Sequence, residues 1–267
     1  MNGKFLWNDG WLFLVTPVGT SYEKAAERRS EFAAVDIPHD WLIHDALHLY
    51  EDGTGWYRKS FVFEQEEKKA FITFEGVYMD STVYINGRKA GEWKYGYSTF
   101  TLDITEFLKQ GENEIFVSVC FQSPNSRWYS GAGIYRDVWF KITDKTYLPE
   151  NAVYVSTKKQ DGGSFLLHLE GEAEGERRED AVLSYSLFDD MGKEVELKSP
   201  DAGDCKIGRV REYLIENVKL WDVENPVLYT LRTDLLLDGE IIWQEEEKIG
   251  FRYTEFHTDK GFFLNGR

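Results

Sequence analysis

The sequence has few cysteines and no long apolar run, and both absences restrict the class of protein. Only two of its 267 residues are cysteine, Cys120 and Cys205, and neither has a CxxC partner. We therefore expect neither a disulfide scaffold nor a cysteine zinc site. Cys120 ends an apolar run, where a small buried thiol is expected. No stretch reaches the roughly 18 apolar residues of a membrane helix, so no membrane span is expected.

Basic residues are scarce relative to acidic ones. The chain has 31 Lys and Arg against 47 Asp and Glu, which gives a net charge of −16 and a pI near 4.8. Binding to nucleic acid depends largely on cations that neutralise phosphates. We therefore expect no nucleic-acid partner and no anionic-membrane partner. The sequence also shows no evident cofactor motif.

The first residues, 1–7, lack the long apolar core of a signal peptide. This favours a cytoplasmic protein, or a secreted one whose signal segment precedes Met1.

Aromatic residues, in contrast, are abundant. They make up 16% of the chain, with 9 Trp, 15 Tyr and 18 Phe, and they suit pleated, half-buried surfaces. Gly, Asn and Asp interrupt the apolar segments often, and no long stretch has the 3.6-residue period of a helix. The sequence therefore predicts an all-β protein. Five tryptophans are expected in core or interdomain packing: Trp7, Trp11, Trp41, Trp56 and Trp93.

The first part of the chain predicts a β-sandwich of the jelly-roll type over residues 1–147. The dipeptide Asn86-Gly87 is typical of a tight hairpin turn. One helical turn is expected at 102–108. Strands are expected at 56–63, 70–75, 81–85, 88–93, 114–121 and 133–143.

After a polar, proline-containing boundary at 144–151, the strand spacing becomes shorter. Seven short strands in about 100 residues are typical of an immunoglobulin-like sandwich, which we place at 148–252. Strands are expected at 153–158, 164–170, 181–188, 193–198, 211–218, 228–237 and 240–246.

Several motifs occur in a recognisable order along the chain. They are VDIPHDW at 35–41, GWYRKSF at 55–61, FEGV at 74–77, VYING at 83–87, SRWYSGAGIYRDV at 126–138, LWDVENPVLYTL at 220–231, GFR at 250–252 and FLNGR at 263–267. Together they resemble the start of a glycoside hydrolase family 2 enzyme, the group of β-galactosidases, β-glucuronidases and β-mannosidases. The stretch at 126–138 is more similar to the β-galactosidase branch.

This resemblance implies a jelly-roll sugar-binding domain (galactose-binding-like), then an immunoglobulin-like domain, then a (β/α)₈ catalytic barrel. Residues 253–267 would form the linker into the barrel, which would begin just after Arg267. Family members are retaining enzymes with two carboxyl groups roughly 5 Å apart. Both would belong to the missing barrel, so we expect no catalytic residue in this chain and no hydrolysis by it alone. The substrate would be a carbohydrate, and a homo-oligomer remains open.

The same resemblance places two loops at the mouth of the barrel. Asp52 matches a position at which a polar side chain touches the sugar. The second loop, 122–133, contributes four further candidates, Asn125, Ser126, Arg127 and Trp128. Sugar recognition needs polar groups for hydroxyls and an aromatic face for ring C–H groups, and this loop has both. Alternatively, Trp128 packs beneath the loop and Arg127 pairs with an acid at an interface.

Two other functions remain open on the sequence. An autonomous carbohydrate-binding module would display aromatic side chains as a sugar platform. A β-sandwich adhesin or interaction protein would usually show repeats, and the chain has no repeat at a fixed period. Neither the particular sugar nor a metal requirement follows from the sequence.

Overall fold

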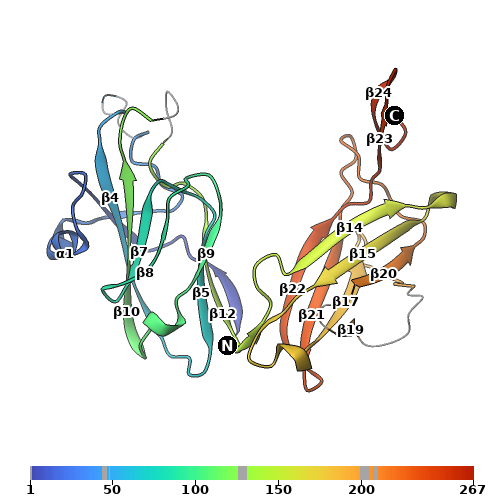
Figure 1. Cartoon of the computed structure of the whole chain (residues 1–267), viewed down its shortest axis with the longest axis horizontal. Coiled ribbons are helices and arrows are strands. Elements are labelled where there is room, and N and C mark those ends of the chain that lie inside the picture. Colours follow the sequence, from blue (N-terminus) through green and yellow to red (C-terminus); the bar gives the residue numbers. More distant parts are fainter. Residues whose placement is uncertain (1, 44–46, 48, 126–130, 199–204, 207–209) are drawn as a thin grey trace. The chain divides into compact units, whose positions relative to one another are not determined.

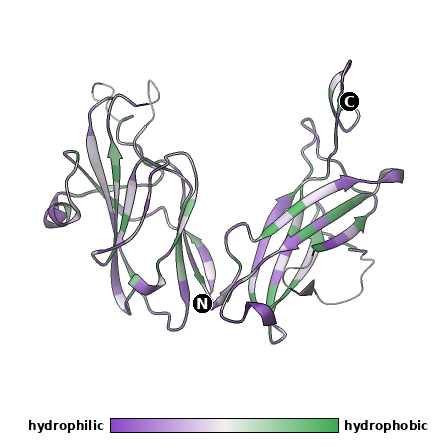
Figure 2. Cartoon of the chain, in the orientation of Figure 1, coloured by the Kyte–Doolittle hydropathy of each residue, from purple (hydrophilic) through white to green (hydrophobic). Residues whose placement is uncertain are grey.

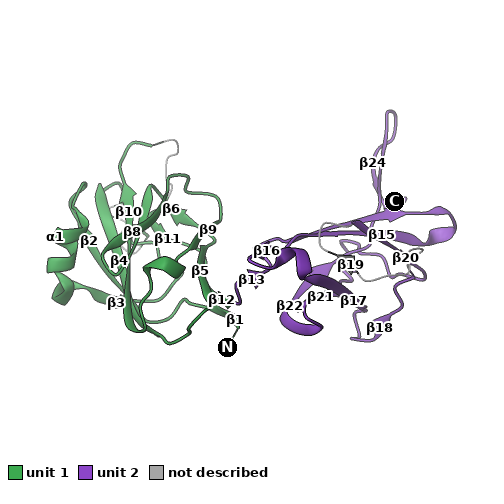
Figure 3. Cartoon of the chain, turned by 60° about the horizontal axis from the view of Figure 1, so that its bottom comes forward, with its two compact units in different colours: residues 1–143 green, residues 144–267 purple. Residues whose placement is uncertain are grey.

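The computed structural model describes residues 2–43, 47, 49–125, 131–198, 205–206 and 210–267. The chain forms two compact units, Met1–Thr143 and Asp144–Arg267 (Figure 3). Both are built almost entirely from antiparallel strands, which confirms the all-β prediction. The predicted domain limits at 147 and 252 differ slightly from this division and stay predictions. Within the described ranges, no helix is long and apolar enough to cross a membrane.

Unit 1 is a sandwich of two sheets (Figure 1). One sheet has the strand order β1-β12-β5-β9 and the other has the order β3-β2-β4-β10-β7-β8, while β6 and β11 form a separate pair. The strands are β1 (Gly3–Leu6), β2 (Trp11–Thr16), β3 (Ala33–Val35), β4 (Gly53–Phe63), β5 (Lys69–Phe74), β6 (Val77–Tyr78), β7 (Ser81–Ile85), β8 (Arg88–Trp93), β9 (Phe100–Asp103), β10 (Gly111–Phe121), β11 (Gly133–Ile134) and β12 (Val138–Thr143).

The core of unit 1 follows from strand alternation. Tyr57 lies opposite Val117, and Val117 lies opposite Val83, so one row of buried side chains crosses three strands. Ile72 and Phe140 pair in the facing sheet and close the core from the other side. Figure 2 shows the matching alternation of apolar and polar residues along the strands.

A second apolar cluster lies outside this core and was not predicted from the sequence. The short helix α1 (Tyr22–Glu27) buries Ala25 against Trp56 and Phe116. Trp11 and Trp56 are buried as predicted, and Trp7 and Trp41 are partly buried against the core. Trp93 departs from the predicted core packing, because its side chain is 37% exposed while its ring stacks on Phe100. Cys120 is free and only half-buried.

Two predicted elements of unit 1 are wrong in extent. The single strand at 133–143 is divided, since β11 pairs with β6 while β12 pairs with β5 and β1. Asn8 holds the break: its Nδ2 donates to Asp137, and its Oδ1 accepts from the Val138 amide. The helical turn is only a 3₁₀ turn at Thr105–Phe107, because the preceding residues continue β9.

Unit 2 is a second sandwich, with the immunoglobulin-like fold that the strand count predicted. One sheet has the order β14-β15-β20 and the other β18-β17-β21-β22, with β19 also paired to β17. Leucines of β15, β17 and β21 form the core with Phe165 and Phe251. The strands are β13 (Thr146–Tyr147), β14 (Val153–Lys159), β15 (Phe165–Gly171), β16 (Glu174–Gly175), β17 (Val182–Phe188), β18 (Glu194–Val195), β19 (Cys205–Lys206), β20 (Val210–Ile215), β21 (Tyr229–Leu237), β22 (Glu240–Ile249), β23 (Thr254–His257) and β24 (Gly261–Leu264).

Residues 253–267 do not run as a simple extended segment. The strands β23 and β24 pair as an antiparallel hairpin. Their predicted role as a linker into a further domain stays a prediction.

Candidate functional site

The two loops predicted to face a sugar leave unit 1 side by side. Strand β4 begins at Gly53, and Gly53 lies opposite Phe121, the last residue of β10. Asp52 therefore comes directly before β4, and residue 122 comes directly after the neighbouring strand β10. Both lie at the upper end of unit 1 in Figure 1. The Ser123 amide donates a hydrogen bond of 2.5 Å to Asp52 Oδ1. This bond joins the two loops at their bases.

The far end of the second loop is held by the segment that carries the VDIPHDW motif. The His39 amide donates to the Ile134 carbonyl at 2.7 Å, and the Trp41 amide donates to the Ala132 carbonyl at 3.1 Å. Asp40 adds a side-chain clamp, because its Oδ1 accepts from the Ala132 amide at 3.1 Å. The motif thus positions the exit of the loop.

A buried phenol completes this exit. The Tyr57 hydroxyl lies 2.7 Å from His39 Nδ1 and accepts from the Ile134 amide at 3.3 Å. Burial raises the pKa of Tyr57 well above its ordinary value, so the hydroxyl stays protonated. Gly133 lies directly against this group at φ 142°, and a Cβ there would be 2.2 Å from the His39 carbonyl oxygen. Only glycine fits this position.

An exposed pair of tyrosines lies beside the loop, and our reading of the sequence missed it. Tyr95 is 62% exposed and Tyr97 is 47% exposed, and their ring centroids are 5.8 Å apart. Tyr97 packs edge-on against the buried ring of Tyr78, which pairs with Gly133 at the loop exit. The Tyr135 hydroxyl donates to the Gly96 carbonyl at 2.8 Å. The signal was present as two aromatic residues around a glycine in a short loop between strands.

The structure describes two of the five predicted sugar-contact residues. Asp52 is exposed and bonded to the second loop, and Asn125 Nδ2 donates to the Gln122 carbonyl at 3.3 Å. The two side chains thus belong to one loop cluster. Ser126, Arg127 and Trp128 lie outside the described residues.

Chemically, the described part of this cluster offers hydrogen-bond acceptors, amide groups and aromatic rings. Such groups suit a neutral, hydroxyl-rich ligand. Among all the residues that the structure describes, no group of three or more His, Cys, Asp or Glu side chains is placed to hold a metal ion.

Two β-sandwiches in this order, with a loop cluster at one end of the first, are the arrangement of the N-terminal domains of a glycoside hydrolase. Residues 16–143 match the family described as "Glycosyl hydrolases family 2, sugar binding domain". Residues 146–252 match "Glycosyl hydrolases family 2". The chain belongs to glycoside hydrolase family 2, as the motifs predicted.

Curated relatives include both galactosidases and glucuronidases. A β-galactosidase of Bacteroides ovatus is 34% identical over 258 residues, which cover 89% of this chain and 30% of that protein. A β-glucuronidase of Bacteroides fragilis is 30% identical over 261 residues, which cover 87% of this chain and 36% of that protein. The chain therefore spans about a third of the length of these relatives.

Solved structures show the same relation. A β-glycosidase from Bacteroides vulgatus superimposes with a TM-score of 0.86 at 29% identity, over 99% of this chain and 36% of that one. A β-glucuronidase from Bacteroides uniformis superimposes with a TM-score of 0.82 at 26% identity, over 100% of this chain and 34% of that one. The fold of both units is thus that of the N-terminal part of larger family members.

Proposed function

We propose that this chain is the non-catalytic N-terminal portion of a retaining β-galactosidase. In this proposal it supports a (β/α)₈ catalytic domain and lends the loops around Asp52 and Asn125 to the substrate pocket. The acid and the nucleophile of the retaining mechanism belong to the catalytic domain, so the chain alone hydrolyses no glycoside. The substrate is a terminal β-galactoside.

One observation supports the pocket role most strongly. The Asp52 carboxylate is bound to the backbone of the neighbouring loop by the Ser123 amide, so its position is fixed while its side chain remains exposed. A fixed, solvent-facing carboxylate has lone pairs left for sugar hydroxyls and loses little entropy on binding them. The galactoside preference is supported by the similarity of residues 126–138 to the β-galactosidase branch.

The test is a chimera in which this chain replaces the matching region of the Bacteroides ovatus β-galactosidase. With a nitrophenyl β-galactoside, Asp52→Ala should lower kcat/KM roughly 10- to 100-fold, since a hydrogen bond to a charged group contributes about 1.5–3 kcal/mol. The nitrophenyl β-glucuronide serves as the competing substrate.

The matched control is Glu112→Ala. Glu112 is exposed on β10, close to the strand end opposite the one that meets Asp52. Equal kcat/KM values for the Asp52→Ala and Glu112→Ala chimeras would remove Asp52 from the pocket. A preference of the chimera for the glucuronide would refute the substrate assignment.

An autonomous carbohydrate-binding module is the second candidate, because Tyr95 and Tyr97 are exposed and fixed. It predicts that the isolated chain binds a glycan and that the Tyr97→Ala variant does not. Calorimetric titration of the chain with galacto-oligosaccharides distinguishes the two candidates, since a partial pocket gives no measurable heat.

A further inference from the structure

The loop between β8 and β9, residues 94–99, is bonded to the rest of unit 1 at both of its ends. At its start, the Asp80 amide donates to the Lys94 carbonyl at 3.3 Å. At its end, the Thr99 hydroxyl donates to the Glu75 carbonyl at 3.3 Å. This segment, called the tyrosine loop below, is therefore held in place although it lies at the surface.

The middle of the tyrosine loop rests on two further tyrosines. The Gly96 carbonyl accepts from the Tyr135 hydroxyl at 2.8 Å. A Cβ at Gly96 would lie 2.3 Å from the Tyr78 ring, so the backbone passes directly over that buried ring. The residues on either side, Tyr95 and Tyr97, thus extend from a fixed backbone, and their side chains are 62% and 47% exposed.

One small apolar cluster supports both the tyrosine loop and the candidate sugar site. The cluster includes Tyr78, Phe121 and Ala132. Phe121 comes directly before the 122–133 loop, and Ala132 lies near the end of that loop. Tyr78 lies beneath the tyrosine loop through its contacts with Gly96 and Tyr97. The two loops therefore border a continuous surface of unit 1.

Arg136 adds hydrogen-bond donors beside the aromatic rings. Its guanidinium lies 5.4 Å from the centre of the Tyr135 ring, and within the described residues it forms no salt bridge. Its N–H groups are therefore available to the hydroxyl groups of a ligand. Fixed aromatic faces with polar donors next to them are what recognition of a sugar requires.

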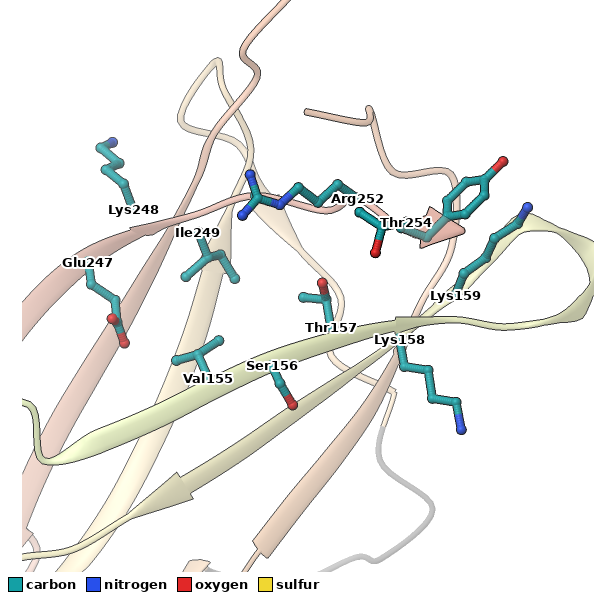
Figure 4. Close-up of a pocket in the computed structure, with 12 residues that line it drawn as sticks. Val155, Ser156, Thr157, Lys158, Lys159, Glu247, Lys248, Ile249, Arg252 and Thr254 are labelled. Carbon is teal, nitrogen blue, oxygen red and sulfur yellow. The ribbon is translucent and has the colours of Figure 1, made fainter. Parts of the chain in front are cut away.

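The groove between β14 and the end of β22 in unit 2 lacks these features (Figure 4). Among the described residues that line it, only Tyr253 is aromatic, and Lys159 Nζ lies 3.7 Å from the centre of that ring. A ring covered by a cation presents little free area to a sugar. This groove is therefore a poor candidate for a second sugar site.

We propose that Tyr95 and Tyr97 bind the leaving group of the substrate and that this leaving group is an oligosaccharide. This inference rests on the proposed function, in which the galactose that is released is terminal. A terminal galactose has a neighbouring sugar only on its reducing side. A second sugar-binding surface next to the pocket can therefore bind only the leaving group. The substrate class is thus an oligosaccharide that ends in β-galactose.

The experiment measures kcat and KM of the chimera described above with two kinds of substrate. One is the nitrophenyl β-galactoside, and the other is a set of tetrasaccharides that end in β-1,3-, β-1,4- or β-1,6-linked galactose. For at least one tetrasaccharide, Tyr95→Ala should raise KM roughly 10-fold and change kcat less than about two-fold, as expected when binding of a remote part of the substrate is lost. The nitrophenyl β-galactoside, whose leaving group is a single ring, should be cleaved as before.

The matched control is Tyr154→Ala, since Tyr154 is 63% exposed and lies on β14 of unit 2. It should leave the kinetics with both kinds of substrate unchanged. Tyr95→Phe keeps the aromatic face, so KM for the tetrasaccharide should stay within about three-fold of the unsubstituted chimera. Tyr97→Ala should raise that KM as Tyr95→Ala does.

The outcomes separate this inference from the proposed function. An unchanged KM for every tetrasaccharide in the Tyr95→Ala chimera overturns the inference. An equal loss with both kinds of substrate also overturns it, because the tyrosines would then support the fold or pack against another part of the protein. Cleavage of the nitrophenyl β-galactoside but of no tetrasaccharide overturns it as well. All three results leave the proposed function intact, whereas a preference for the nitrophenyl β-glucuronide overturns the proposed function itself.

Discussion

Single residues at the loop exit decide whether the candidate site is held in place. Gly133 meets the His39 carbonyl and the Tyr57 hydroxyl so closely that no side chain fits between them. The Asp52 carboxylate accepts from the Ser123 amide, and the Asp40 carboxylate accepts from the Ala132 amide. The two bonds hold the two ends of the 122–133 loop. Hydrogen bonds between these carboxylates and backbone amides far away along the chain therefore help to fix the geometry of this loop cluster.

Substitution of Gly133 tests this directly. Gly133→Ala should cost about 3 kcal/mol or more in the free energy of unfolding of unit 1, since the new Cβ overlaps backbone that cannot move freely. Gly19→Ala is the control, because Gly19 also has a positive φ, 79°, but no atom lies within 4 Å of its Cβ position. It should cost only ~1 kcal/mol. Equal costs in urea unfolding would show that the loop exit yields to the added methyl group.

At this scale Asp52 and Asn125 were predicted to contact the sugar from the family resemblance of their loops. The structure brings the two loops together, and the contact with a sugar stays a prediction. Tyr95 and Tyr97 were missed because the sequence alone does not distinguish an aromatic loop residue that packs inward from one that is exposed. The Tyr97 ring packs edge-on against Tyr78 of β6, a contact that the loop sequence alone does not indicate.

At the scale of elements, the half-buried Lys59 connects the start of the chain to the central sheet. Lys59, on β4, donates to the Asp9 carbonyl at 2.6 Å and lies 4.2 Å from the centre of the Trp7 ring. Burial lowers the pKa of Lys59 from 10.5 to about 8. The segment between β1 and β2 is thus held by a lysine that loses its proton at a lower pH than an exposed lysine does.

This shift predicts a pH dependence of stability. Between pH 8 and pH 10.5 the unfolded chain holds a proton at Lys59 that the folded chain has released, so the free energy of unfolding rises with pH in this window. From pH 7.5 to 9.5, wild type should gain about 1 kcal/mol relative to Lys59→Met, after allowance for partial exposure. Urea unfolding of both proteins at both pH values measures the difference. A constant difference would mean that Lys59 is as solvated as in the unfolded chain.

Most strands were predictable because alternation and turn dipeptides are local signals. The strands 81–85 and 88–93 around Asn86-Gly87 match β7 and β8. The break between β11 and β12 was not predictable, since it depends on Asn8, about 130 residues away along the chain. Helix α1 was missed because it is only six residues long.

At the scale of the whole molecule, the two sandwiches match about a third of the length of larger family members. Each unit has its own core, and unit 2 also bears a hairpin that its own core does not cover. The family motifs predicted this organisation because they extend through both units. Local sequence patterns did not predict the exposed apolar side chains of this hairpin, because their exposure depends on the three-dimensional packing around them.

The most direct test of the central claim is turnover by the 267-residue chain alone. The purified chain should release no nitrophenol from a nitrophenyl β-galactoside above the buffer rate, whereas the chimera with the catalytic domain of the Bacteroides ovatus relative should release it readily. Sustained turnover by the chain alone, retained after a second purification step, would contradict the assignment of bond cleavage to a separate domain.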